Sequence, residues 1–286
     1  MVTSTKGRLA AGVVVLGFIL LYWQVFVSLV MDWYHDDNYS HGFLIVPIAA
    51  YFAWERRDRL KAIAAKPSML GLVVVLGSIA VLLAGILGSE LFLTRISIIG
   101  ALTGTVLFML GWRHLRILAF PIGFLLLMIP IPAILFNQIA FPLQLLASRF
   151  GESAMSMADV PVLREGNVLI LANTTLEVAE ACSGIRSLVS LLTLAIVLGY
   201  FSDRRLWVRL AVALSSIPVA VVTNGIRVAG TGIAAHRFGA AAAEGFFHEF
   251  SGWLVFVAAF ALTLAIQRVI AFVSPGGRPG PVPASV

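Results

Sequence analysis

Residues 69–89 read MLGLVVVLGSIAVLLAGILGS and decide what kind of protein this chain forms. The stretch contains no charged side chain. At about 1.5 Å of rise per residue, a helix of this length crosses the roughly 30 Å hydrocarbon core of a bilayer. Backbone groups in lipid must be paired internally, which leaves helices or closed barrels. Barrel strands alternate over about ten residues, so this unbroken run predicts a transmembrane helix.

Comparable runs recur along the chain and set its fold class. Of 286 residues, 60% are hydrophobic and only 12% are charged, whereas about a quarter are charged in a typical soluble domain. The sequence therefore predicts an all-α integral membrane protein with about eight transmembrane helices. Pro130 and Pro132 are expected to break the fifth. The predicted spans lie near 9–31, 40–54, 69–89, 91–110, 116–131, 182–201, 207–228 and 249–272.

The basic residues predict the orientation of these spans. With the N-terminus in the cytoplasm, 14 of the 20 Lys and Arg fall on the cytoplasmic side, as the positive-inside rule requires. We therefore expect both termini to lie inside. The net charge of +6 is explained by these loops, so membrane lipids are expected partners and nucleic acid is not. The other six basic residues are Arg95, Arg149, Arg164, Arg186, Arg227 and Arg237.

The domain organisation follows from the polar stretches. Residues 1–273 are expected to form one polytopic domain, with 132–181 as a small extracytoplasmic or interfacial cap. Within the cap, 134–150 predict a helix at the interface or a re-entrant piece. The triplet Glu165-Gly166-Asn167 lies between β-prone runs and predicts a hairpin. The Pro/Gly-rich residues 274–286 predict a disordered cytoplasmic tail. The first apolar run is too long for a cleaved signal peptide.

Cys182 is the only cysteine, which excludes an intrachain disulfide. It lies where a polar segment becomes a predicted helix, flanked by Glu180, Ser183 and Arg186. A helix N-terminus stabilises a thiolate, the nucleophilic form of cysteine. The alternative is a small buried hydrophobic residue.

Two further polar residues lie at extracytoplasmic ends of predicted spans. Arg227 could hold the developing charge of a carbonyl oxygen, with Asn224 on the same helical face; its alternative is an anchor that snorkels to the interface. His248 could exchange a proton with a thiol and an amine, with Glu249 beside it; its alternative is an interfacial polar residue. With Cys182, they would lie at one membrane depth. His236 is a rival for the histidine.

Other polar features predict less. Residues 32–47, DWYHDDNYSHGFLIVP, hold two histidines and three aspartates in a spacing that fits no tight metal motif. We therefore expect no metal and no cofactor. Trp33 and Tyr34 are expected to anchor the chain at the interface. Glu90 and Arg95 are expected to pair at the rim.

Four short blocks together resemble the exosortases, bacterial membrane transpeptidases related to archaeosortases. They are NYSHGFL at 38–44, EACSG at 180–184, NGIR at 224–227 and HEFSG at 248–252. The blocks occur in the family's order over roughly residues 10–272. The resemblance implies Cys182 as nucleophile with Arg227 and His248 as partners, and Gly184 as part of the supporting motif.

The resemblance also implies substrates and location. The substrates would be exported proteins with a C-terminal PEP-CTERM sorting signal, made of a Pro-Glu-Pro-like motif, a span and a basic cluster. The site would face the periplasm from the bacterial inner membrane, in an exopolysaccharide-producing cell. An acceptor nucleophile, amine-bearing or linked to lipid or saccharide, would complete the transfer. A transporter or flippase, and a non-catalytic scaffold of a polysaccharide export complex, remain alternative functions.

Overall fold

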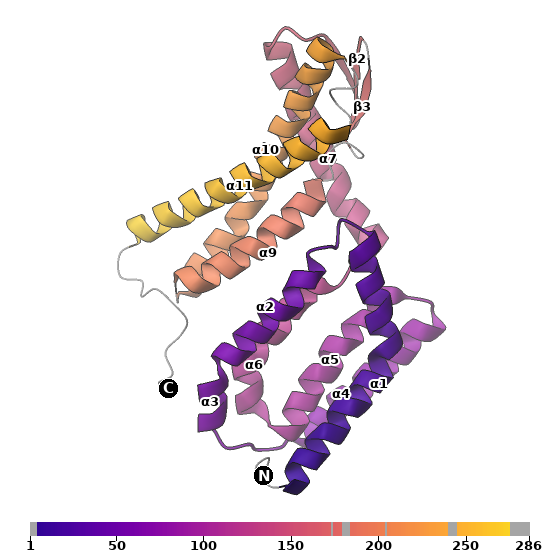
Figure 1. The fold of residues 1–286 in the computed structure, drawn as a ribbon, viewed down its shortest axis with the longest axis vertical. Helices are drawn as coiled ribbons and strands as arrows, with labels where there is room; N and C mark the ends of the chain where they lie inside the picture. The colour runs from indigo at the N-terminus through magenta and orange to yellow at the C-terminus, as the bar shows by residue number, and fades with distance from the viewer. Residues whose placement is uncertain (1–4, 173, 179–183, 204, 240–244, 275–286) are drawn as a thin grey trace. The chain divides into compact units, whose positions relative to one another are not determined.

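The computed structural model describes residues 5–172, 174–178, 184–203, 205–239 and 245–274. The chain divides into two compact units, Met1–Pro132 and Ala133–Val286 (Figure 1). In the described part of the first unit, all regular secondary structure is helical. Its elements are α1 (Thr5–His35), α2 (Gly42–Glu55), α3 (Arg57–Ala62), α4 (Met69–Leu87), α5 (Leu91–Met109), α6 (Trp112–Phe124) and the short 3₁₀ helix η1 (Leu125–Met128).

The second unit combines long helices with a small sheet. Its described elements are α7 (Ala133–Met157), β1 (Val162–Glu165), β2 (Val168–Leu171), β3 (Thr175–Glu177), α9 (Gly184–Ser202), α10 (Leu206–Phe238) and α11 (Gly245–Val273). Apart from Ser274, the predicted disordered tail lies outside the described residues.

The helices confirm the predicted class, an all-α membrane protein. Among the described residues, five helices are long and apolar enough to cross a bilayer, or six if the bent pair Trp112–Met128 and Ala133–Met157 makes one span. Two shorter apolar helices, Gly42–Glu55 and Arg186–Ser202, coincide with the second and sixth predicted spans. The count of eight and the orientation stay predictions. The five long spans are Gly12–His35, Met69–Leu87, Leu91–Met109, Leu206–Phe238 and Phe250–Val273.

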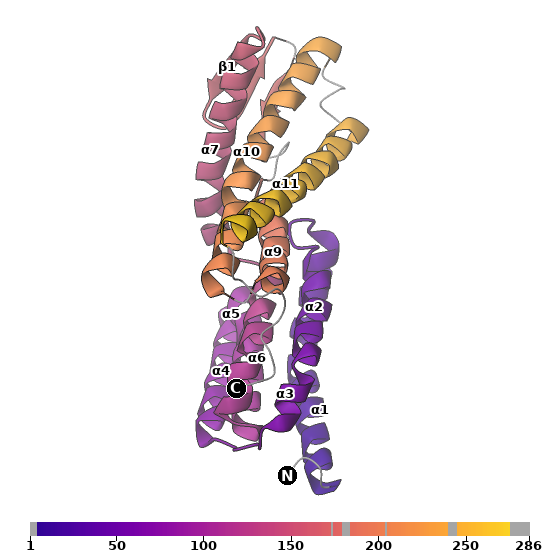
Figure 2. The same ribbon diagram turned by 90° about the vertical axis from the view of Figure 1, so that its left-hand side faces the viewer.

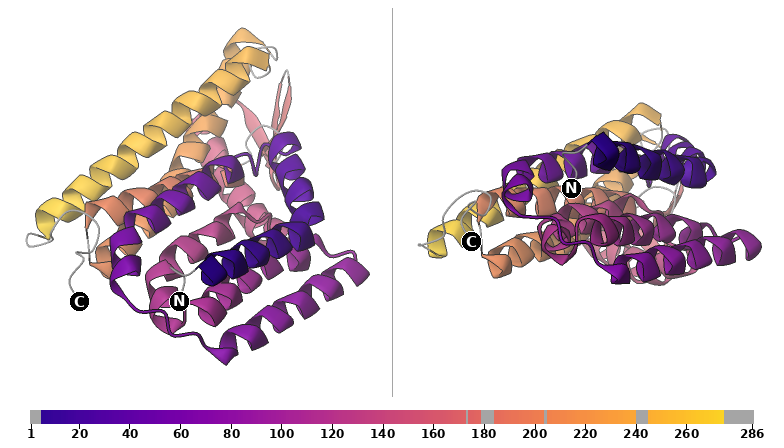
Figure 3. Two further views of the ribbon diagram at one scale, coloured as in Figure 1. Left: turned by 60° about the horizontal axis from the view of Figure 1, so that its bottom comes forward. Right: turned by 90° about the horizontal axis from the view of Figure 1, so that it is seen from below.

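Small residues let α4 and α5 approach each other closely, side by side (Figure 3). A Cβ added at Gly104 would lie 2.8 Å from the backbone nitrogen of Val75, and one at Gly85 would lie 2.8 Å from that of Thr94. Real Cβ atoms essentially never come so close to another atom. Because lipid removes the hydrophobic drive between helices, such close backbone packing is what holds them together.

Arg95 of α5 is buried, and its partner is not the predicted one. Its guanidinium pairs with Asp32 of α1 at 2.6 Å and donates a hydrogen bond to the hydroxyl of Ser28 at 3.2 Å. The expected rim pair with Glu90 is therefore wrong. The true partner lies 63 residues earlier in the chain, where local spacing gives no sign of it.

A second contact between distant residues involves Trp33, which is buried rather than an interface anchor. Pro132 has no N–H, so the carbonyl of Met128 loses the donor that a continuing helix would supply. The indole Nε1–H of Trp33 donates to that carbonyl at 2.9 Å. The anchor prediction for Trp33 was wrong because it considered only the residue's place in sequence. Tyr34 is well exposed, and its anchoring role stays a prediction.

The neighbouring residues extend this contact. Nε2 of His41 lies 3.2 Å from the carbonyl oxygen of Leu127, so the tautomer with a proton on Nε2 donates to it. A Cβ at Gly42 would run into the indole ring of Trp33. The stretch 33–42 thus supplies side chains that satisfy the carbonyls freed where η1 ends before Pro130 and Pro132. We call this contact the proline clamp.

In the second unit, α7 packs along α10, with the sheet beside them (Figure 2). A Cβ at Gly151 would lie 2.7 Å from Val228 Cγ1, and one at Gly225 would lie 2.6 Å from Phe150 Cδ1. The helix predicted over 134–150 exists, extends to Met157, and buries one face here. The core shared by helices and sheet consists of Ala147, Met155, Val160, Leu169, Leu171, Leu176, Val178, Val228 and Ala235.

The predicted hairpin is confirmed. Strands β1 and β2 pair antiparallel with Glu165 opposite Val168, which leaves Gly166 and Asn167 as a two-residue turn. Gly166 has a φ of +65°, a conformation that side chains with a Cβ rarely adopt. Strand β3, which the sequence did not predict, pairs with β2 and places Leu176 opposite Leu169.

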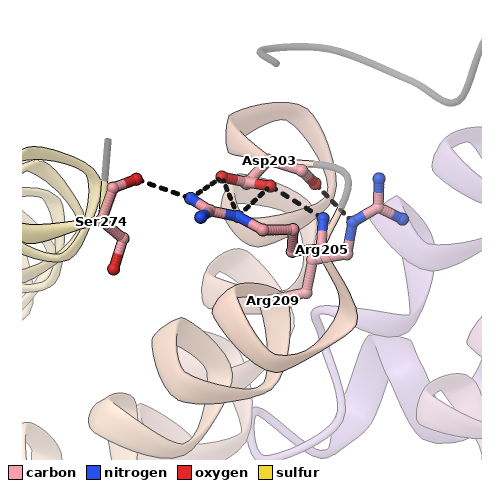
Figure 4. Close-up of polar contacts among 4 residues, drawn as sticks. All are labelled: Asp203, Arg205, Arg209 and Ser274. Carbon is pink, nitrogen blue, oxygen red and sulfur yellow. Dashed lines mark hydrogen bonds and ion pairs between the residues drawn. The ribbon is translucent and has the colours of Figure 1, made fainter. Parts of the chain in front are cut away.

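A polar network ties the α9–α10 turn to the end of α11 (Figure 4). Arg205 bonds the buried carboxylate of Asp203 through Nη2 at 2.7 Å and through Nε at 3.2 Å. The same Nη2 donates to the carbonyl of Ser274 at 2.8 Å. Nε of Arg209 donates to the backbone carbonyl of Asp203 at 2.6 Å. Charge-assisted bonds of this kind are stronger than neutral ones, so they fix one end of the three helices that carry the candidate site.

Candidate functional site

A narrow crevice lies among α9, α10 and α11, with a volume of about 280 Å³ that includes space open to solvent. We call it the arginine crevice, because Arg227 is the one charged residue among its described lining residues. Helix α9 contributes Ser187 and Leu191, helix α10 contributes Ala220, Thr223, Asn224 and Arg227, and helix α11 contributes Gly252, Val255, Phe256 and Ala259.

The polar lining residues come mainly from one face of α10. Asn224 and Arg227 are three residues apart, so they lie on the same face. Asn224 is buried, with 8% of its surface exposed. Thr223 uses its hydroxyl within the helix, bonding the carbonyl of Val219 at 2.8 Å. A guanidinium beside an amide offers several N–H donors to one small space. Such a set suits an oxygen that is negative or becomes negative.

Helix α11 meets the guanidinium of Arg227 at a glycine. A Cβ added at Gly252 would lie 2.9 Å from Nη2, 3.1 Å from Cζ and 3.4 Å from Nη1 of Arg227. The guanidinium therefore occupies the space that a side chain at position 252 would need. The NGIR and HEFSG blocks, 21 residues apart from Arg227 to His248, thus meet at this point in the fold.

The cysteine block is only partly described. Helix α9 is described from Gly184, and the predicted helix start near Cys182 lies outside the described residues. Arg186 lies exposed in the first turn of α9. Glu180, Cys182 and Ser183 lie outside the described residues, so the position of the thiol relative to Arg227 remains a prediction.

The HEFSG block at 248–252 lies within about the first two turns of α11, which begins at Gly245. His248 and Glu249 belong to this helix, and their side chains lie outside the described part of the structure. Residue 248 precedes Gly252 by four positions, so the two share a helical face. Whether the side chain of His248 approaches Arg227 stays a prediction.

The rival histidine and the aspartate-rich stretch do not contribute to the arginine crevice. His236 follows Arg227 by nine residues on α10, about 13 Å along the helix axis, and does not line the crevice. In the stretch 32–47, Asp32 is held by Arg95. Within the described ranges, no group of three or more His, Cys, Asp or Glu side chains is placed to hold a metal ion.

Besides the apolar lining residues, Ser187, Thr223 and Gly252 were not predicted to contribute to the site. Ser187 is a serine in an apolar helix and gave no pattern of its own. Thr223 stands next to Asn224, and its position could have been derived from the helical period. Gly252 belongs to the HEFSG block. Its contribution is the absence of a side chain, which leaves room for the Arg227 guanidinium, and this can be seen only in the packed structure.

The long apolar helices and the arginine crevice together define a polytopic α-helical membrane protein with a polar site between its last three described helices. The chain belongs to the transmembrane exosortase family, whose family description matches residues 33–265. The match covers most of the chain and includes all of the described helices from α2 to α10. No match to the chain was found among curated proteins or solved structures. The resemblance first suggested by four short blocks is confirmed at the level of the family.

Proposed function

We propose that this chain is a membrane cysteine transpeptidase that removes C-terminal sorting signals from exported proteins at the periplasmic face of the inner membrane. Exosortases are in general cysteine transpeptidases that process sorting signals. The observation that carries the proposal is the arginine crevice, where Arg227 of one motif block contacts Gly252 of another. The substrates would carry PEP-CTERM-type signals and serve an exopolysaccharide system.

The proposed reaction begins with the thiol. His248 accepts the proton of Cys182, and the thiolate sulfur attacks a backbone carbonyl carbon of the substrate. A C–S bond forms, and the carbonyl oxygen takes up the electron pair as an oxyanion. Arg227 donates N–H groups to that oxygen from the arginine crevice, assisted by the Asn224 amide.

The intermediate then collapses and releases the signal. The C–N bond breaks, His248 gives its proton to the leaving amine, and a thioester joins the substrate to Cys182. An acceptor nucleophile attacks the thioester carbon and releases the thiol. Exclusion of water protects a thioester from hydrolysis, and a site at the membrane boundary favours transfer to an acceptor on that ground.

Transport of an anionic substrate is the less favoured function. That alternative relied on Arg95 and Arg227 as two binding cations. Arg95 is buried and neutralised by Asp32 within the first unit, which leaves it unsuited to bind a second anion.

The test is a processing assay in cells, with an exported protein that carries a PEP-CTERM-type signal and a tag on each side of it. The wild-type enzyme should separate the two tags, and Cys182→Ala should abolish the separation. Arg227→Lys, which keeps the charge but loses the planar fork, should reduce it severely. Arg237→Lys is the matched control, because Arg237 is exposed near the end of α10. Unchanged processing by Cys182→Ala would reject a thiol enzyme and favour a scaffold or a transporter.

A further inference from the structure

Gly252 faces a charged group, whereas the other described glycines with close neighbours face backbone atoms or uncharged side chains, such as Phe150 at Gly225. At Gly71 and Gly104 on α4 and α5, the atoms nearest to an added Cβ include backbone atoms of the facing helix. At Gly252, the three nearest atoms are Nη2, Cζ and Nη1 of Arg227, and none belongs to a backbone. The space that a side chain at position 252 would fill is thus occupied by the guanidinium of Arg227.

We propose that Gly252 is a positioning residue for the reaction, which sets the place of the Arg227 guanidinium in the arginine crevice. This inference rests on the proposed function of Arg227 as a donor to the oxyanion. A side chain at position 252 would push the guanidinium off α11, because a separation of 2.9 Å is closer than real Cβ atoms approach. The displaced group is the end of a long flexible side chain, so the helix backbones can stay where they are.

The consequence for catalysis follows from the distances that an oxyanion donor must satisfy. Donors act at about 2.7–3.1 Å from the oxygen, and a misplacement of about 1 Å can cost on the order of 100-fold in rate. An interaction made only in the transition state affects kcat, whereas one made equally with bound substrate affects KM. Displacement of Arg227 should therefore lower kcat and leave KM nearly unchanged.

Substitution of Gly252 should not lower the stability of the folded protein, although it lowers kcat. Alanine is a better helix former than glycine, and the three nearest described atoms belong to a movable side chain. Gly252→Ala should thus fold at least as well as the wild type. A glycine that served helix packing would instead lose stability when substituted, and activity would fall with it.

The experiment measures kcat, KM and thermal unfolding of the purified full-length enzyme in lipid nanodiscs, with a peptide that spans a PEP-CTERM-type signal. Gly230→Ala is the matched control, because Gly230 lies on α10 with no atom within 4 Å of an added Cβ. We expect kcat of Gly252→Ala and Gly252→Ser to fall about 10–100-fold, with KM within about twofold and an unfolding temperature equal to or above that of the wild type. Gly230→Ala should keep wild-type kcat.

Three outcomes would overturn the inference. If Gly252→Ala keeps its turnover while Arg227→Lys loses it, the positioning role fails and the proposed function stands. If the unfolding temperature of Gly252→Ala falls together with kcat, Gly252 is a packing residue. If Arg227→Lys and Cys182→Ala also keep full turnover, the proposed function fails, and the positioning role fails with it.

Discussion

Arg95 of α5 and Asp32 of α1 form an ion pair in the first unit, with 2.6 Å between Nη2 and the carboxylate oxygen. Only 3% of the Arg95 side chain is exposed, against 36% for Asp32. The pair is therefore asymmetric. Loss of the carboxylate would leave a buried cation without its counter-ion, whereas loss of the cation would leave a carboxylate that water can still reach.

This asymmetry predicts unequal costs for the two substitutions. Asp32→Asn should destabilise the protein by about 3–5 kcal/mol, the usual cost of breaking a buried pair. Arg95→Met should cost less, because the remaining carboxylate is partly solvated. Thermal unfolding in detergent micelles measures both, and Asp58→Asn is the control because its pairing with Arg57 lies at an exposed surface. Equal destabilisation by the two variants would contradict the asymmetry.

The proline clamp makes a separate prediction about stability. Trp33→Phe keeps an aromatic ring but removes the donor to the Met128 carbonyl, which Pro132 cannot replace. We expect a loss of about 1–3 kcal/mol, the cost of an unsatisfied buried acceptor. Trp23→Phe is the matched control, since Trp23 lies on the same helix with 60% of its surface exposed. An equal loss from both variants would show that the hydrogen bond does not matter.

The orientation of the spans can be measured with reporter fusions. Fusions after residues 60, 115 and 205 should report the cytoplasm, and fusions near 35, 160 and 240 should report the periplasm, because basic residues concentrate on the first side. The fusion near residue 160 is the most informative, because this residue lies between α7 and the sheet, in the part of the chain that precedes Cys182. A cytoplasmic result there would put Cys182 in the wrong compartment for exported substrates.

The state of the thiol is a fourth prediction. Cys182 should react with a membrane-impermeant thiol reagent added from the periplasmic side, faster at pH 7 than an unactivated thiol, because the predicted helix start and the predicted neighbour Arg227 would favour thiolate. The control is the same protein after full denaturation. Labelling of the denatured protein alone would support the alternative in which Cys182 is a buried hydrophobic residue.

The sequence predicted those parts of the fold that depend on local chemistry. Apolar runs predicted the long helices because lipid allows only helices and closed barrels, and barrel strands would alternate rather than run unbroken. The hairpin was predicted because a glycine in a two-residue turn is recognisable by itself. Strand β3 was not predicted because its three residues form a strand only by pairing with the edge of β2.

Contacts between distant residues could not be predicted in the same way. The partner of Arg95, the acceptor of the Trp33 indole and the role of Gly252 all depend on how helices pack. For the site, the sequence named Arg227 and Asn224, which line the arginine crevice. Ser187 and Gly252 emerged only from the packing of α9 and α11 on α10. The roles of Cys182 and His248 remain predictions.

The mass of the new C-terminus of a processed substrate tests most sharply whether Cys182 transfers the substrate to an acceptor. Substrate from cells with wild-type enzyme and from cells with Cys182→Ala should be purified and compared by intact-mass and peptide mass spectrometry. Wild-type cells should remove the C-terminal span and basic cluster and leave a terminus with additional mass from the acceptor, while Cys182→Ala should leave the full-length chain. A free carboxylate at the new terminus, in cells where export is intact, would reject transfer and leave a cysteine protease. Removal of the signal by Cys182→Ala would contradict the thiol mechanism itself.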